Sequence, residues 1–176
     1  DKVNVVFLLD TSASMRDNIQ QVATHLYAMT DTYDMHALEY FLGMIEFSVR
    51  HGEKFIRMEP LLADVGLLQN RMQRVELSGD EYALDALLYS LDTIEFHGDA
   101  EKHLILVTDE PARTGVNAES IQTMREKVAT VYGLTDVSVN VLGFDEPFQR
   151  QLAEKTGGLW QEIPGGTFAT FSRIVW

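Results

Sequence analysis

The stretch VNVVFLLDTSASM, residues 3–15, decides the fold expected for this chain. Its first seven residues have almost no polar character, which is typical of a strand buried on both faces of a parallel sheet. Asp10, Ser12 and Ser14 come next, and a pattern typical of a helix follows them. In open α/β sheets, ligands bind outside the carboxyl ends of the strands. We therefore expect these three oxygen-bearing side chains to lie at a binding edge.

Length and composition limit the class of protein. The chain has 176 residues, 45% of them hydrophobic and 23% charged, which suits one globular domain. With 27 Asp and Glu against 14 Lys and Arg, the net charge is −13, so nucleic acids and anionic membrane surfaces are poor partners. The absence of cysteine excludes disulfides and thiolate zinc sites. No apolar run approaches the roughly 18 residues of a membrane-inserted helix.

The remainder of the chain alternates predicted strands and helices. Apolar spacing predicts helices near residues 14–34, 67–75, 80–94, 117–132, 148–157 and from 168 onward. Later strands are predicted at residues 38–47, 55–58, 103–109, 137–144 and 159–163. The short strand at 55–58 is expected at the sheet edge, with Pro60 ending it. This alternation predicts a mostly parallel sheet with helices on both faces.

A second apolar strand, residues 103–109, also ends in a hydroxyl and a carboxylate. If it neighbours the first strand, one edge gathers the side chains of Asp10, Ser12, Ser14, Thr108 and Asp109. The loop at residues 78–81 enters a helix from that edge and could add Asp80. All of these are hard oxygen donors, which favour magnesium, calcium or manganese over zinc or copper.

A purely structural role is the competing interpretation for part of this set. Ser14 and Asp80 each stand where a helix is predicted to begin, so both could be simple N-caps. Asp10 and Asp109 are harder to explain in that way. A carboxylate at the end of a long apolar strand is costly unless it is solvated, hydrogen-bonded or bound to a cation.

These motifs resemble those of the von Willebrand factor A domain with its metal-ion-dependent adhesion site. The resemblance is carried by residues 10–14 after the apolar strand and by residues 106–109, and residues 42–48 and 86–87 fit the same family. It implies a Rossmann-like three-layer α/β sandwich. The implied six-stranded sheet has the order 3-2-1-4-5-6, with a short antiparallel edge strand and helices on both faces.

The resemblance also implies roles for the residues. Ser12 and Ser14 would ligate a divalent cation through their hydroxyls, while Asp10 and Asp109 would hold it mainly through water. An acidic group of a partner protein would complete the coordination, because indirect carboxylates leave the ion under-neutralised. The expected function is therefore metal-dependent protein binding, in adhesion or assembly, and not catalysis. Magnesium is the expected ion, with calcium and manganese as alternatives.

Two departures from the family pattern bear on the site. The usual second-loop threonine is replaced by an aspartate, Asp80, with Glu81 as the rival position. Direct ligation by Asp80 would give the loaded site a charge of about −1 and weaken its attraction for an acidic partner. Glu110, followed by Pro111, replaces the usual glycine after Asp109. This replacement adds a negative charge and makes the backbone at the border of the site more rigid.

Two other functions remain open from sequence. A metal-free scaffold domain for complex assembly is one. The other is a phosphohydrolase with Asp10 as nucleophile, although such enzymes resemble Asp-x-Asp here and this chain has Ser12. We expect residues 1–176 to form a single domain of a longer protein. The compartment is left open, with the cell surface or extracellular space slightly favoured.

Overall fold

β1 (Lys2–Asp10) lies at the centre of the structure, and its residues 3–10 are all buried. The computed structural model describes residues 1–50, 53–115 and 120–163. Burying a Val, Leu or Phe side chain contributes roughly 1.5–3 kcal/mol relative to leaving it exposed. Val5, Phe7 and Leu9 pack toward one face of the sheet, and Val6 and Leu8 toward the other. The apolar run that opens the sequence is therefore a strand buried on both faces, as predicted.

The chain alternates strands and helices along its length. The other strands are β2 (Glu39–Arg50), β3 (Glu53–Leu62), β4 (Glu101–Val107), β5 (Val137–Gly143) and β6 (Trp160–Glu162). A short 3-10 turn (Ala13–Met15) precedes the helices α1 (Arg16–Met35), α2 (Val65–Gln73), α3 (Ala83–Thr93), α4 (Ile121–Gly133) and α5 (Pro147–Lys155).

The six strands form one sheet in the order β3-β2-β1-β4-β5-β6, which confirms the predicted order. All neighbouring pairs are parallel except β2 and β3, so the predicted antiparallel edge strand is also confirmed. Asp10 pairs with Phe47 of β2, and Leu9 pairs with Val107 of β4. This register brings the carboxyl ends of three strands together at one edge.

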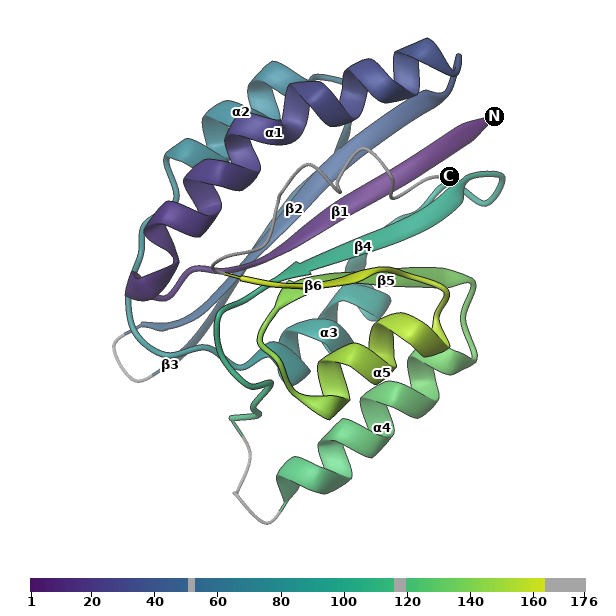
Figure 1. Ribbon diagram of the computed structural model, residues 1–176. Helices are drawn as coiled ribbons and strands as arrows, with labels where there is room; N and C mark the ends of the chain where they lie inside the picture. The colour runs from purple at the N-terminus through teal and green to yellow at the C-terminus, as the bar shows by residue number, and fades with distance from the viewer. Residues whose placement is uncertain (51–52, 116–119, 164–176) are drawn as a thin grey trace.

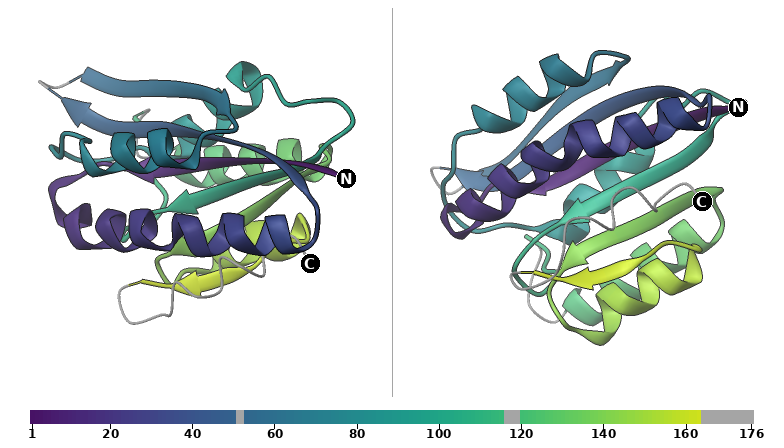
Figure 2. Two further views of the ribbon diagram at one scale, coloured as in Figure 1. Left: turned by 90° about the horizontal axis from the view of Figure 1, so that it is seen from above. Right: turned by 45° about the horizontal axis from the view of Figure 1, so that its top comes forward.

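Helices cover both faces of the sheet, as Figures 1 and 2 show. α1 and α2 lie on one face, where Ile19, Leu26 and Leu68 pack against β1 and β2. α3, α4 and α5 cover the other face with Leu87, Val128 and Leu152, among other side chains. The result is the three-layer Rossmann-like sandwich that was expected.

Two predicted helix caps are wrong. Ser14 lies inside the 3-10 turn, and Met15 occupies the N-cap position of α1. Tyr82, not Asp80, occupies the N-cap position of α3. Neither cap residue, Met15 or Tyr82, makes a side-chain cap hydrogen bond. Capping therefore does not account for a hydroxyl at residue 14 or a carboxylate at residue 80.

The edge strand β3 is longer than expected. It continues through Pro60 to Leu62, whereas the sequence predicted a short strand that Pro60 would end. The register against β2 shifts between Leu42 and Met44, opposite this segment. An edge strand tolerates proline because one row of its N–H groups has no partner strand to bond.

Some predicted features fall outside the described residues. The final helix from residue 168 and the start of the helix predicted at 117 belong to this group. Within the described ranges, no helix combines the length and the apolar character needed to cross a membrane.

Candidate metal centre

Asp10, the last residue of β1, is completely buried. The Ser12 amide donates a hydrogen bond of 2.8 Å to its Oδ1, and the Thr108 hydroxyl donates one of 2.8 Å to its Oδ2. Burial raises the pKa of Asp10 to about 6, although the hydrogen bonds from Ser12 and Thr108 oppose the shift. The nearby charge of Asp109 raises this pKa further. The predicted convergence of the β1 and β4 ends is therefore confirmed.

Ser12 and Ser14 present two hydroxyls side by side beyond the end of β1. Their Oγ atoms are 3.3 Å apart. Ser12 is buried and Ser14 is exposed, so the pair leads from the interior to the surface. Ser12 is the N-cap of the 3-10 turn, with an extended backbone, and Ser14 lies within the turn. Two adjacent hydroxyl oxygens are suitable ligands for a hard cation.

Asp109 carries the strongest sign of a missing ligand. Its Oδ1 atom is buried and has no hydrogen-bond partner in the part of the chain that the structure describes. A buried carboxylate oxygen without a partner costs more than a neutral one, and native structures contain few. A bound cation is one way to satisfy such an oxygen, and the charge of Asp109 already acts on Asp10 at the end of β1.

Backbone hydrogen bonds hold the second loop, residues 74–82, against the ends of β1 and β2. The Ser78 amide donates to the Thr11 carbonyl at 2.9 Å, and the Val49 amide donates to the Asp80 carbonyl. Gly79 adopts a φ of +69°, and a Cβ there would lie 1.8 Å from the Val49 carbonyl oxygen. Only glycine fits this close approach, so Gly79 determines how the loop backbone passes Val49 at the end of β2.

That path directs Glu81 inward and leaves Asp80 exposed. Glu81 is only 2% exposed. Burial first, and then the charge of Asp10, raise the pKa of Glu81 to about 7, while Arg113 opposes the shift. Glu81, the alternative to Asp80 in the second loop, is therefore buried and is affected by the charge of Asp10. Ligation of an ion by either residue stays a prediction.

Arg113 is a member of the site that sequence reasoning missed. Its Nη2 atom is 3.0 Å from Oε1 of Glu81. The Arg113 carbonyl also accepts a 3.0 Å hydrogen bond from the Leu84 amide at the start of α3. Asp85 holds the same loop by accepting from the Thr114 hydroxyl at 2.7 Å and the Gly115 amide at 2.9 Å. No local pattern in the sequence marks these pairings.

A second set of contacts, from residues of and next to α5, fixes the third loop, residues 108–115. Glu146 accepts from the Ala112 amide at 3.1 Å and pairs with Arg125 at 3.2 Å. Gln149 donates to the Glu110 carbonyl at 2.8 Å. The main chain around residues 110–112 is thereby held in place, which a loop that supplies a metal ligand requires.

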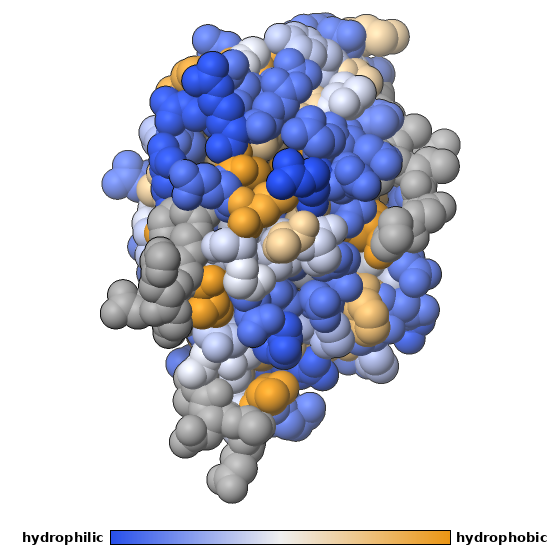
Figure 3. All heavy atoms as spheres, turned by 90° about the vertical axis from the view of Figure 1, so that its left-hand side faces the viewer, coloured by the Kyte–Doolittle hydropathy of each residue, from blue (hydrophilic) through white to orange (hydrophobic). Residues whose placement is uncertain are grey.

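Carboxylates alone do not form this centre. Among residues 1–50, 53–115 and 120–163, no three His, Cys, Asp or Glu side chains form a group that could hold a metal ion. A ligand set here must therefore combine one or two carboxylates with the serine hydroxyls. Figure 3 views the side of the molecule toward which β1 runs, and its visible described surface is mostly hydrophilic, with a few apolar side chains near the middle.

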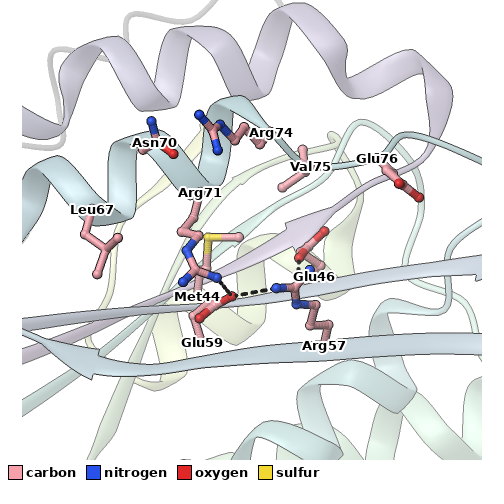
Figure 4. A pocket seen from close by; sticks show the side chains of 10 residues that line it. All are labelled: Met44, Glu46, Arg57, Glu59, Leu67, Asn70, Arg71, Arg74, Val75 and Glu76. Atoms are coloured by element: carbon pink, nitrogen blue, oxygen red, sulfur yellow. Dashed lines mark hydrogen bonds and ion pairs between the residues drawn. The ribbon is translucent and has the colours of Figure 1, made fainter.

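A separate cavity of about 570 Å³ lies between α2 and the β2–β3 pair (Figure 4). Its charged side chains largely neutralise one another. Glu59 pairs with Arg71 at 2.6 Å and with Arg57 at 3.0 Å, and Glu46 lies 4.0 Å from Arg57. With its charges engaged in this way, the cavity shows no preference for an ion of either sign.

Fold and strand-end chemistry together define an α/β domain with an oxygen-lined candidate cation site. The von Willebrand factor type A domain family matches residues 4–159, and the chain belongs to this family. A comparison with curated protein sequences gives no significant match.

Solved structures show the same fold at low sequence identity. The conserved hypothetical protein BatB from Bacteroides thetaiotaomicron is 16% identical, with a TM-score of 0.67 over 92% of this chain and 90% of that chain. The SpRpn10 VWA domain is 13% identical, with a TM-score of 0.69 over 98% and 93%. Proximal thread matrix protein 1 from the mussel byssus, described with a zinc-occupied MIDAS motif, is 16% identical, with a TM-score of 0.63 over 98% of this chain and 46% of that chain.

Proposed function

We propose that this domain binds a divalent cation at the carboxyl edge of its sheet and uses the ion to bind an acidic group of a partner protein. Asp109, Ser12 and Ser14 are the direct ligands in this proposal. Asp10 supports them from within, and Asp80 or Glu81 completes the second-loop side. The observation that carries the proposal is the buried Asp109 Oδ1 without a hydrogen-bond partner among the described residues. The charge of Asp109 acts on Asp10, and two hydroxyls not engaged in capping follow Asp10 in the chain.

Other features support the same proposal. Membership of the von Willebrand factor type A family favours a protein-interaction module over an enzyme. A structural neighbour is described with zinc at the corresponding kind of motif, which supports a divalent cation without fixing the metal. We propose magnesium because every candidate ligand is an oxygen, with calcium and manganese as alternatives.

Isothermal titration calorimetry of the EDTA-treated, desalted domain tests ion binding, with magnesium, calcium, manganese and zinc titrated separately. Ser12→Ala and Asp109→Ala should each weaken binding at least tenfold, as expected when a ligand of a small site is lost. Ser138→Ala and the exposed Asp92→Ala are the matched controls and should bind as the wild type does. Absence of heat and of thermal stabilisation with every ion would refute the site and favour a metal-free scaffold.

Acetate serves as a probe for recognition of an acidic group. In NMR spectra of the magnesium-loaded domain, acetate should shift the amide signals of Ser12, Ser14 and Glu110. The same addition in the presence of EDTA should leave them in place. Shifts that are equal in both conditions would show that acetate binds without the ion and would contradict the proposed role of the metal.

The phosphohydrolase alternative is disfavoured by the state of Asp10. Its carboxylate is buried, and both of its oxygens accept hydrogen bonds. A nucleophilic carboxylate needs an oxygen that can reach the substrate. The scaffold alternative has no specific observation in its favour.

A further inference from the structure

The ion pair between Arg113 and Glu81 lies at the border of the candidate metal centre, where Glu81 is one of the two candidates for the second-loop position. Glu81 is 2% exposed, and the Arg113 side chain is 41% exposed. The charge of Asp10 acts on Glu81, so this carboxylate belongs to the same electrostatic environment as the site. A buried carboxylate beside two others would be costly without a compensating positive charge.

We propose that Arg113 is a built-in counter-cation of the ion site: by pairing with Glu81 it lowers the affinity for the divalent ion and makes the loaded site less negative. This inference rests on the proposed function. It assigns to Arg113 the control of ion affinity, and through the net charge of the loaded site, the ability to attract a partner's carboxylate.

The position of Arg113 is set by its backbone as well as by its ion pair. The hydrogen bond from the Leu84 amide to the Arg113 carbonyl anchors the residue to α3. Asp85, in the first turn of that helix, holds Thr114 and Gly115. The backbone on both sides of the Arg113 side chain is therefore held against α3, next to Glu81.

Charge counting shows what Arg113 changes. Asp10, Glu81 and Asp109 are three carboxylates, and the charges of Asp80 and Glu110 also act on Arg113. A divalent ion offsets two negative charges, and the guanidinium of Arg113 offsets one more. The loaded centre is therefore one charge less negative with Arg113 than without it. Without Arg113 the centre would repel an acidic partner more strongly.

The surroundings keep Arg113 charged and directed to the site. Negative charges of Glu81, Asp80 and Glu110 all raise the pKa of its guanidinium, with the hydrogen bond to Glu81 as the largest cause. Its Nε atom is buried and lacks a hydrogen-bond partner within the described residues. The guanidinium thus retains a donor that Glu81 does not use.

The experiment is a double-mutant cycle in magnesium affinity, measured by calorimetry on the whole domain. Arg113→Gln should tighten magnesium binding about tenfold, because a positive charge close to the ion is removed. Glu81→Gln should weaken binding severalfold, since the same positive charge is then unopposed. The double variant should bind within about threefold of wild type. Arg113→Lys, which keeps the charge, should stay close to wild type.

Lys127→Gln is the control for the change in total charge, because Lys127 is exposed on α4. It should leave the affinity unchanged. Acetate should bind the magnesium-loaded Arg113→Gln variant more weakly than the wild type, in the NMR titration described above. This second readout tests whether Arg113 makes the loaded site less negative, and it does not depend on the ion affinity.

The outcomes separate this inference from the proposed function. If wild type binds magnesium and Arg113→Gln binds equally or more weakly, the counter-cation role is overturned while the metal site stands. If no protein, wild type included, binds any ion, both are overturned. Should Arg113→Gln fail to fold by circular dichroism, the Glu81→Gln and double variants decide, because equal affinities of Glu81→Gln and wild type also overturn the inference.

Discussion

The Thr108 hydroxyl donates a 2.8 Å hydrogen bond to Asp10 Oδ2 across 98 residues of sequence. Both residues are completely buried, at the ends of two adjacent parallel strands. This bond joins the first and third loops of the site, and it also supports a carboxylate that burial makes costly. The candidate centre therefore depends on a contact that stabilises the fold.

Replacement of Thr108 by valine tests this contact. The shape is nearly kept, but Asp10 Oδ2 loses its donor, so we expect a loss of about 1–3 kcal/mol in the free energy of unfolding. Urea denaturation followed by circular dichroism measures it. Thr32→Val is the control: Thr32 is half-buried, its hydroxyl donates to the Ala28 carbonyl of its own helix, and the change in stability should be less than about 1 kcal/mol. Equal effects of the two substitutions would contradict the prediction.

Gly79→Ala should displace the second loop. The methyl group would meet the Val49 carbonyl, and the positive φ disfavours any side chain. We expect a loss of about 1–3 kcal/mol in unfolding free energy and weaker magnesium binding. Gly133→Ala is the matched control, because a Cβ there meets nothing within 4 Å and alanine favours the helix. A loop that tolerates alanine at residue 79 would show that the path past Val49 is not fixed.

The stability of the metal-free domain should depend on the ionisation of Asp10. Its folded-state pKa is about 6 against an ordinary value of 3.8, so the folded state favours the protonated form. This contribution is fully present below about pH 4 and is lost as the pH rises through about 6, amounting to on the order of 3 kcal/mol. Unfolding with EDTA from pH 4.5 to 8 should therefore show wild type losing stability relative to Asp10→Asn.

The comparison with Asp10→Asn reports the ionisation of Asp10 together with its effect on Glu81, whose pKa the Asp10 charge raises. The asparagine can accept from Ser12 and donate to Thr108. The substitution can also change the stability by an amount that is the same at every pH, so the informative quantity is how the stability difference between the two proteins changes with pH. Added magnesium should recover part of the loss at pH 8 in wild type. Parallel stability profiles for the two proteins would rule out a raised pKa for Asp10.

Glu146→Ala should loosen the third loop, although residue 146 lies far from that loop in the sequence. It removes the acceptor of the Ala112 amide and the partner of Arg125. We expect faster hydrogen exchange at Ala112, a stability loss of about 1–3 kcal/mol, and weaker magnesium binding. Glu126→Ala on the exposed side of α4 is the control and should do none of these. Unchanged exchange at Ala112 in Glu146→Ala would show that other contacts hold the loop.

Hydrophobic patterning predicted the sheet and most of its elements, because that information is local. The apolar residues 3–9 and 103–107 could be buried only as inner strands between two layers of helices. Asp10, Ser12 and Ser14 directly follow the first of these strands, so their place at its carboxyl end was predictable. The length of β3 was not, since the local sequence does not show that an edge strand continues past Pro60.

The sequence by itself determined which strand ends carry oxygen donors, and only the tertiary structure decided which side chains of the loops face them. Asp80 and Glu81 are neighbours with the same charge, and the choice between them follows from backbone contacts with Val49 and Thr11. The pairing of Arg113 with Glu81 likewise depends on the docking of the third loop onto α3. Strand burial is encoded by each segment's own periodicity, whereas the direction of a loop side chain is set by hydrogen bonds to residues far away in the chain.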